Sequence, residues 1–411
     1  MDYYKFEKEI EETETVIILK KSLISKLNQN TSILRTPWHR YIDEVELLSL
    51  LIILWSLFGG FVLISASWWT GTKEMGDGLY HIKRQSSWLL AGTGLCLLAI
   101  RTRISFWLKS APYVLFLGSF LLIATLILGR SINGASRWLM IGPLQLQPSE
   151  LIKPFILLQS INIFNELGSK TTRLRTFWIC AFGVIILLIL KQPNLSTAII
   201  VSTLVWFVAW VAGIDFKTIS ISAILGLLIG CISVVLNQYQ FVRVTSFIDP
   251  WKDANGSGHQ LVQSLLALGS GGLLGQGYGF SIQKLQYLPI KETDFIFSIF
   301  GEEFGFIGSL MVLTFLFFFN FLGLRIAYIC NENKSRLLAV GCTTLIVGQS
   351  IANIAVASGT IPTTGLPLPL VSYGGNSLLV NLLISGLLIR CALESSKITA
   401  KIYRRKTTLI R

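Results

Sequence analysis

Charged residues are scarce in this sequence. Of its 411 residues, 14% are Asp, Glu, Lys or Arg, whereas about a quarter are charged in a typical soluble protein. This scarcity argues against a soluble enzyme, and an apolar share of 52% excludes a disordered chain or a collagen. The six cysteines lie in or beside apolar segments without C-x-x-C spacing, so we expect small core residues rather than disulfides or zinc ligands.

The apolar residues come in long uninterrupted runs. No charge occurs in 218–242, in 304–324 or in 337–389. About 20 apolar residues cross the hydrocarbon core of a bilayer as a helix, and the last run is long enough for two crossings. We therefore predict an all-α polytopic membrane protein with about ten transmembrane helices. One long extracytoplasmic loop, residues 238–294, is expected between helices 7 and 8.

The net charge of +13 could indicate a nucleic-acid partner, but its distribution indicates a membrane topology instead. With ten crossings, 24 of the 35 Lys and Arg fall on the side of the two termini, 10 on the other side, and Lys153 within a helix. Positive residues gather in the cytoplasm, so both tails are predicted to be cytoplasmic. The predicted parts are a polar tail (1–44), a membrane domain (45–395) and a basic tail (396–411).

The predicted outer loop does not have the composition of a disordered segment. It contains a turn at 249–251, a helical stretch at 260–268 and a glycine-rich run at 269–279. No G-x-G-x-x-G pattern follows a strand, which excludes a dinucleotide-binding fold. The glycines fit either simple turns or backbone amides that surround a phosphate.

Three groups of ionisable residues lie near the predicted hydrocarbon, where a charge is costly and therefore marks a candidate site. Glu150 and Lys153 share a helix face and form either a structural ion pair or a functional one. Glu302 and Glu303 fit the entry of a helix, whose N-terminus favours negative charge.

Asp294 is the third case, and it ends the long loop just before an apolar helix. A carboxylate in such surroundings should have a raised pKa, which suits a general base. The alternative is a helix-capping residue. No other outward loop offers a base in so favourable a position, so we predict Asp294 as the catalytic residue.

Short motifs in a fixed order resemble those of the SEDS family (shape, elongation, division and sporulation) over about residues 45–395. They are KRQ (83–85), NGASRW (133–138), QPSELIK (147–153), FIDPW (247–251), GHQLVQS (258–264), GSGG (269–272), QKLQYLP (283–289), TDF (293–295), GEEFG (301–305), PTTGLPLP (362–369) and SYGG (372–375). Each motif alone is weak, but together they are specific. The segment 365–370 resembles the division-type branch of the family more than the elongation-type branch.

The resemblance implies a peptidoglycan glycosyltransferase that polymerises lipid II, with the essential aspartate at Asp294. It also implies a class B penicillin-binding transpeptidase as partner, with other division proteins, in the bacterial inner membrane or in the envelope of a plastid that retains peptidoglycan. The sequence departs from the family pattern at Asn194, Ser196, Glu292 and Asn376. Glu292 beside Asp294 could raise the pKa of that aspartate further.

A diphosphate leaving group departs as a stable anion, so one carboxylate could suffice where ordinary glycoside hydrolysis needs two. Asp294 would then deprotonate the acceptor sugar, lipid II, with the growing glycan strand as donor. Outward cations would bind the diphosphate, with no certain cofactor but a divalent cation (Mg or Mn) as a candidate. The predicted cations are Lys83, Arg84, Arg137, Arg243, Lys284 and Lys291. Each could instead simply extend to the membrane interface.

Two other functions remain open at this stage. A lipid II flippase would also have many helices with charges inside the membrane, and Glu150 and Lys153 would lie on its route. Such transporters often consist of two repeated halves, and no convincing repeat is found here. A non-catalytic scaffold that recruits the transpeptidase would tolerate the loss of Asp294.

Overall fold

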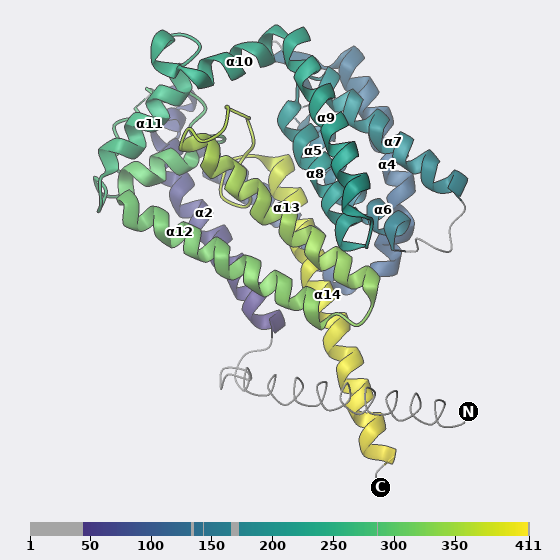
Figure 1. The fold of residues 1–411 in the computed structure, drawn as a ribbon. Helices are drawn as coiled ribbons and strands as arrows, with labels where there is room; N and C mark the ends of the chain where they lie inside the picture. Colours follow the sequence, from purple (N-terminus) through teal and green to yellow (C-terminus); the bar gives the residue numbers. More distant parts are fainter. Residues whose placement is uncertain (1–43, 133–134, 143, 166–171, 286, 410–411) are drawn as a thin grey trace, which may run out of the picture. The chain divides into compact units, whose positions relative to one another are not determined.

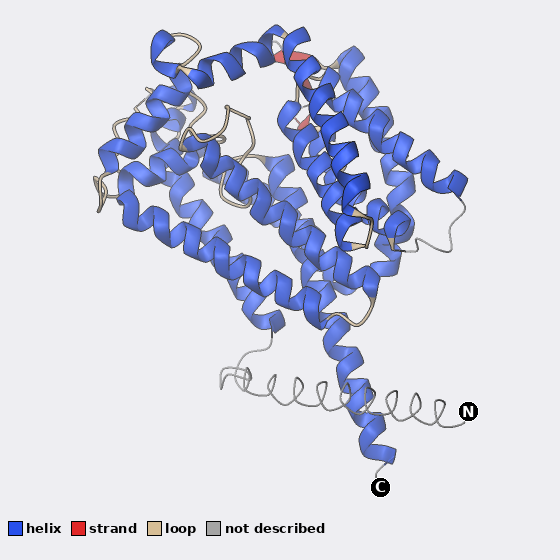
Figure 2. Ribbon diagram, viewed as in Figure 1, coloured by secondary structure: helices blue, strands red, loops and turns tan. Residues whose placement is uncertain are grey.

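The computed structural model describes residues 44–132, 135–142, 144–165, 172–285 and 287–409 (Figure 1). The chain divides into two compact units, Met1–Leu47 and Leu48–Arg411. The second unit contains the helices and strands described below, except for the first residues of α2. This unit consists almost entirely of helices (Figure 2). The predicted tails 1–44 and 396–411 lie largely outside the residues whose side chains are described.

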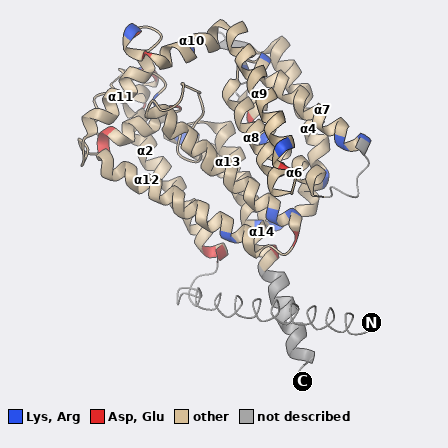
Figure 3. Ribbon diagram, in the orientation of Figure 1, with Lys and Arg blue, Asp and Glu red and all other residues tan. Residues whose placement is uncertain are grey.

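Seven helices in the described part of the chain are long and apolar enough to cross a membrane. They are α2 (Glu44–Met75), α4 (Ile104–Leu128), α7 (Thr172–Lys191), α9 (Phe216–Leu236), α12 (Ile296–Ile329), α13 (Asn333–Ala357) and α14 (Gly375–Leu409). The charged residues of the described helices lie mostly near helix ends (Figure 3). The protein is therefore an integral membrane protein with several spans, as the sequence predicts.

Three shorter or less apolar helices pack among these seven. They are α3 (Tyr80–Arg101), α6 (Lys153–Phe164) and α8 (Leu195–Val211); the single turn α5 (Pro148–Leu151) precedes α6. Helix α3 lies along α14, whereas α6 packs against α4, α8 and α13. Ten of the twelve residues of α6 are buried, including Gln159 and Ser160, so a lower apolar content reflects contact with protein rather than lipid.

Small residues allow α3 and α14 to approach closely. A side chain at Gly92 would collide with Leu382, and one at Gly386 would collide with the backbone of Cys96. Such small-residue contacts are typical of membrane helices, where van der Waals packing holds neighbours together. Among the seven long helices, α13 and α14 are the most buried, whereas α9 buries none of its residues.

A small antiparallel sheet follows α4, so the prediction of a purely helical protein was wrong in this region. Strands β1 (Arg130–Ile132), β2 (Ala135–Ile141) and β3 (Leu144–Leu146) pair in the order β1-β2-β3. Leu139 lies opposite Leu146, and Gly142 has a φ of 60° in the turn between β2 and β3. Two strands of only three residues leave too little alternation to be recognised in a sequence.

The segment between α9 and α12 is well structured. It contains α10 (Gln238–Ile248), the 3₁₀ turn η2 (Pro250–Asp253) and α11 (His259–Gly271). The helix predicted at 260–268 is confirmed with slightly wider bounds. Asn237 begins α10 by accepting hydrogen bonds from the backbone N–H of Tyr239 and Gln240.

Candidate functional site

A cavity of about 450 Å³ lies where helix ends, the small sheet and two connecting segments meet. Its walls come from the end of α2, the start of α3, β2, α10, the residues before α12 and the segment 358–374 that joins α13 to α14. The charged and aromatic residues that line it are Tyr80, His81, Arg84, Trp88, Arg137, Trp138, Tyr239, Arg243, Asp294 and Tyr373. Asp294 is the only carboxylate among the described lining residues.

Asp294 is held by backbone contacts rather than used as a helix cap. The residue at the N-cap of α12 is Phe295, and no side chain caps this helix. The backbone carbonyl of Asp294 accepts a hydrogen bond of 2.7 Å from the Nδ2 of Asn353 on α13. The carboxylate is thereby left at the cavity wall, where it can meet a ligand.

Two arginines share the surroundings of this carboxylate. A methyl group on Gly365 would stand 3.5 Å from Asp294 Oδ2, 3.6 Å from Arg243 Nη1 and 3.7 Å from Arg137 Nη1. The three charged groups therefore gather around the bare backbone of one glycine. Gly365 has a φ of 74°, a conformation that other residues rarely adopt.

The ring of Tyr239 lies against the guanidiniums of both arginines. This residue was not predicted from the sequence. Its ring lies 4.7 Å from the guanidinium carbon of Arg243 and 5.6 Å from that of Arg137. Tyr239 and Arg243 are four residues apart in α10 and so share one helix face. Arg137 also donates to the backbone carbonyls of Gln192 and Pro193, whereas Arg243 donates to that of Thr363 at 3.3 Å.

Burial raises the pKa of the Asp294 carboxyl above its ordinary value, as the sequence predicts. The positive charges of Arg243 and Arg137, and a hydrogen bond from Thr293, act in the opposite direction without cancelling the effect of burial. Glu292 is engaged elsewhere: it accepts a hydrogen bond of 2.6 Å from Thr70 and lies 3.9 Å from Lys291. The carboxylate of Asp294 therefore combines a raised proton affinity with neighbouring cations.

The segment 358–374 is fastened to the helices around it. Asn353 donates to the carbonyl of Leu366 as well as to that of Asp294, both at 2.7 Å. The Ser372 hydroxyl donates to the carbonyl of Thr293 and accepts from the N–H of Leu368. These hydrogen bonds thus fix the position of the segment that carries Gly365 relative to the residues around Asp294.

The predicted intramembrane pair is present. Lys153 Nζ lies 2.6 Å from Glu150 Oε2, and both side chains are almost fully buried. Lys153 also donates to Gln349 Oε1 at 2.8 Å, and the amide of Gln349 donates to the carbonyl of Pro367 at 2.9 Å. The pair lies outside the lining of the cavity but connects to the segment 358–374.

Glu302 and Glu303 lie in the short first part of α12, between Ile296 and a kink at Gly305, whose backbone is not helical, so they directly precede the long second part of this helix. Glu302 accepts hydrogen bonds from the backbone N–H groups of Ile282 and Gln283. Glu303 forms an ion pair of 2.8 Å with Lys284. Both carboxylates therefore hold the segment before α12 in place.

The predicted cations fall into two groups. Arg84, Arg137 and Arg243 line the cavity together with Asp294. The three lysines do not line it, and each is paired with a carboxylate elsewhere. The pairs are Lys83 with Asp77 at 2.7 Å, Lys284 with Glu303 at 2.8 Å and Lys291 with Glu292 at 3.9 Å. The structure therefore brings together the three arginines and not the three lysines, and the role of each in substrate binding stays a prediction.

The four departures from the family pattern have local partners. Asn194 caps α8 through the N–H of Thr197, and Ser196 donates to the carbonyl of Thr364 at 2.8 Å. Asn376 lines the cavity and donates to the carbonyl of Gln145 at 2.7 Å. Across the described residues, no cluster of three His, Cys, Asp or Glu side chains could hold a metal.

The fold defines a polytopic helical membrane protein, and its cavity is lined by a carboxylate and three arginines. The chain belongs to the FtsW/RodA/SpoVE family, described as cell cycle proteins, whose model matches residues 45–397. It is 42% identical over 359 residues to the probable peptidoglycan glycosyltransferase FtsW of Synechocystis, covering 87% of this chain and 91% of that one. It is 45% identical over 346 residues to the putative peptidoglycan glycosyltransferase FtsW of Mesostigma viride, covering 84% and 83%.

Solved structures agree with these relatives. A chain of a peptidoglycan synthase complex, described as coordinating polymerization and crosslinking, has a TM-score of 0.68 at 27% identity and covers 85% of this chain and 97% of that chain. The rod shape determining protein RodA of Thermus thermophilus has a TM-score of 0.63 at 26% identity, with 85% and 96% covered. The family expected from the motifs is therefore confirmed over most of the chain.

Proposed function

We propose that this protein is a peptidoglycan glycosyltransferase that polymerises lipid II during division, with Asp294 as general base. The observation that supports this function best is the gathering of Asp294, Arg137 and Arg243 around Gly365. A base beside fixed positive charge is what transfer from a diphosphate donor requires. The relatives named as peptidoglycan glycosyltransferases FtsW support the same reaction.

In the proposed reaction, Asp294 takes the proton of the acceptor hydroxyl on lipid II. The hydroxyl oxygen forms a bond to the anomeric carbon of the growing strand, and the bond from that carbon to the diphosphate oxygen breaks. The polyprenyl diphosphate leaves as an anion, whose charge Arg137 and Arg243 neutralise. One displacement of this kind converts an α-linked donor into a β-linked chain.

The raised pKa of Asp294 serves this step, because a carboxylate with a higher proton affinity is a stronger base. The positive charges of the two arginines oppose this rise of the pKa. Tyr239 keeps both guanidiniums beside the carboxylate, so that stabilisation of the leaving group needs little rearrangement.

A divalent cation such as Mg²⁺ or Mn²⁺ would fit only with help from the substrate. Mg²⁺ is commonly bound by one or two carboxylates together with phosphate oxygens, and Asp294 supplies one carboxylate at the cavity wall. When bound, the ion would add positive charge next to the diphosphate. Polymerisation that continues unchanged in a chelator would remove the ion from this proposal.

We also propose that α3, α8 and the consecutive helices α5 and α6 together add three crossings to the seven longer helices, which gives ten. The distribution of Lys and Arg then places both termini in the cytoplasm and Asp294 on the opposite side. This places the site in the outer half of a bacterial inner membrane or in the corresponding position in a plastid envelope. Relatives from Synechocystis and Mesostigma are consistent with either setting.

A class B transpeptidase is the proposed partner, because the similar synthase complex couples polymerization to crosslinking. Such a partner would crosslink the strand that this protein makes. Copurification of the full chain with a transpeptidase from the same organism, followed by a polymerisation assay with and without it, tests the association and its effect.

The deciding experiment is polymerisation of purified lipid II by the full chain in detergent, where no bilayer remains to be crossed. We expect wild-type protein and Asp77→Asn, an exposed carboxylate outside the cavity lining, to make glycan and Asp294→Asn to make none. Asp294→Asn should still insert and bind the transpeptidase. Polymer at the native rate from Asp294→Asn would remove this residue from the chemistry.

The same assay separates the two rival functions. A flippase would make no polymer in detergent, although it would move lipid II across vesicles. A scaffold would make no polymer either, and cells that carry Asp294→Asn would still divide.

A further inference from the structure

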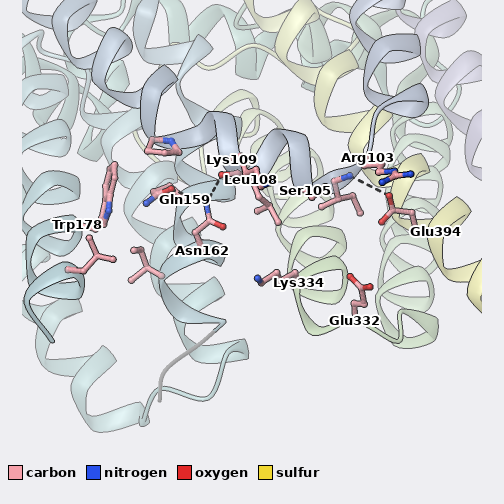
Figure 4. Close-up of a pocket in the computed structure, with 14 residues that line it drawn as sticks. Arg103, Ser105, Leu108, Lys109, Gln159, Asn162, Trp178, Glu332, Lys334 and Glu394 are labelled. Atoms are coloured by element: carbon pink, nitrogen blue, oxygen red, sulfur yellow. Dashed lines mark hydrogen bonds between the residues drawn. The ribbon is translucent and has the colours of Figure 1, made fainter. Parts of the chain in front are cut away.

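Figure 4 shows a second cavity, of about 630 Å³. It lies at the end of the helices that is remote from Asp294. It is lined by the first turns of α4, the last turns of α6, the start of α7, the turn between α12 and α13, and α14. The opposite ends of α4 and α13 lead to β1 and to the segment 358–374, which belong to the Asp294 side. The two cavities therefore lie at opposite ends of the same helices.

Positive charge predominates around this second cavity. Arg103 and Lys109 are exposed at its edge, and Lys334 is a third lining cation. Of the two lining carboxylates, Glu394 accepts a hydrogen bond of 2.8 Å from Arg390 and one of 3.4 Å from the N–H of Ile104. The charge of Glu394 is thus already compensated, which leaves Glu332 as the other described carboxylate in the lining, near the exposed Arg103 and Lys109.

Below this edge the cavity has an apolar floor, beside which the polar side chains of Gln159 and Asn162 also line it. Leu108, Ile163 and Trp178 are buried lining residues, at 7%, 0% and 6% exposure. Asn162 connects α6 to α4 by donating to the carbonyl of Leu108 at 2.7 Å (Figure 4). A cationic edge above an apolar floor matches a ligand with an anionic head and hydrocarbon attached to it.

The cavity lies beside the surface that we expect to contact lipid chains. On α4, Phe106, Tyr113 and Phe116 are 56%, 76% and 57% exposed. Lys109 is only five residues into the helix, about 8 Å from its start, which is the depth of the headgroup region. Aromatic residues next to basic ones are typical of such membrane interfaces.

We propose that this cavity binds the phosphate headgroup of an anionic membrane lipid in the leaflet at this end. The guanidinium of Arg103 and the ammonium of Lys109 donate to the phosphate oxygens, and the acyl chains lie along the exposed faces of α4 and α7. Basic pockets between membrane helices recognise anionic headgroups in this way. The site is separate from the Asp294 cavity and does not depend on the proposed reaction.

Native mass spectrometry of the full chain in detergent tests the proposal, with phosphatidylglycerol and phosphatidylcholine as probes. We expect phosphatidylglycerol to bind more tightly than phosphatidylcholine. Lys109→Gln should weaken the binding of phosphatidylglycerol about fivefold, and the double variant Arg103→Gln with Lys109→Gln about thirtyfold. Each cation near a membrane surface contributes about a fivefold increase in affinity for an anionic lipid. Excess inorganic phosphate should not displace the lipid, because it lacks the chains that occupy the apolar floor.

Lys217→Gln is the matched control, because Lys217 is exposed in the first turn of α9, at the same end of the helices and outside the cavity lining. It should bind phosphatidylglycerol like the wild type. Lys109→Gln alters an exposed helix position and remains informative if Arg103→Gln, at the N-cap of α4, disturbs folding. Equal binding of both lipids, equal weakening by Lys217→Gln, or displacement by inorganic phosphate would overturn the proposal.

Discussion

Asn353 donates hydrogen bonds to the backbone carbonyls of both Asp294 and Leu366, each at 2.7 Å. A single amide on α13 therefore fixes the residue that carries the carboxylate and the segment that carries Gly365. The position of the proposed base depends on this amide as well as on its own neighbours.

Asn353→Leu keeps the approximate size of the side chain and removes both donors. The buried carbonyl of Leu366 would lose its partner, which costs about 1 to 3 kcal/mol, and the partly buried carbonyl of Asp294 would lose the same donor. We expect a lower melting temperature and a larger fall in kcat than rise in KM, because the base is displaced rather than the substrate lost. Melting in detergent and lipid II polymerisation measure the two effects, and unchanged kcat in a folded variant would contradict this positioning role.

Gly365→Ala should remove activity while leaving the protein folded. Its methyl group would stand 3.5 Å from Asp294 Oδ2 and occupy space that the reacting groups need. The positive φ adds about 1 kcal/mol of backbone strain. Gly279→Ala is the matched control: Gly279 has a φ of 85° with no neighbour within 4 Å, so it should show the strain alone. Equal polymerisation by both variants would speak against a role for the space around Gly365.

Arg243→Gln should move the acidic limb of the pH–rate profile to higher pH. Burial raises the pKa of Asp294 and the charge of Arg243 opposes this rise, so loss of that charge raises the pKa further. A general base works deprotonated, and activity therefore falls as the pH drops through its pKa. Arg243→Lys keeps the charge and should leave the limb close to its native position. A limb that does not move in Arg243→Gln would show that another group controls it.

Asp294→Asn should be at least as stable as the wild type near neutral pH. Because the pKa of Asp294 is raised in the folded protein, stability falls as the pH rises from the ordinary carboxyl value to the folded one, and asparagine lacks this penalty. Asp77→Asn should have the opposite sign, because a hydrogen bond from Lys83 lowers the pKa of Asp77. Melting temperatures at several pH values test both signs.

Lys153→Met should destabilise the protein strongly, because it leaves Glu150 charged and buried without its partner. Removal of one member of a buried ion pair costs about 3 to 5 kcal/mol. The double variant Glu150→Gln with Lys153→Met should regain most of this stability. If it also regains polymerisation, the pair is structural; if it folds but stays slow, the bond from Lys153 to Gln349 matters for the site.

The sequence was sufficient to predict the membrane class and the helix at 260–268, and it singled out Asp294, which lines the cavity. Long uncharged runs have few alternatives to helices that cross a membrane. A carboxylate at the border of such a run is conspicuous because so few charges occur nearby. Arg137 and Arg243 were also recognised, although only as two of six cations of equal standing.

Other features depend on contacts between residues far apart in the chain. The ion pair of Lys284 with Glu303 was not predicted, because the two residues are 19 positions apart and a turn that the sequence does not specify brings them together. Strands β1 and β3 are too short for a periodic pattern. Tyr239 could have been noticed from its spacing to Arg243 in α10, but Arg137 reaches the same ring from another part of the chain.

The bonds that fasten the segment 358–374 come mostly from uncharged groups: the indole of Trp55, the amides of Gln85, Gln349 and Asn353, and the hydroxyl of Ser196. Dissolved ions screen charges but have little effect on neutral donors. The segment around Gly365 should therefore keep its conformation at high ionic strength. The positive charges of the guanidiniums beside it, in contrast, are screened by added salt. Under the proposed function, higher ionic strength should therefore weaken binding of the diphosphate while the segment around Asp294 keeps its position.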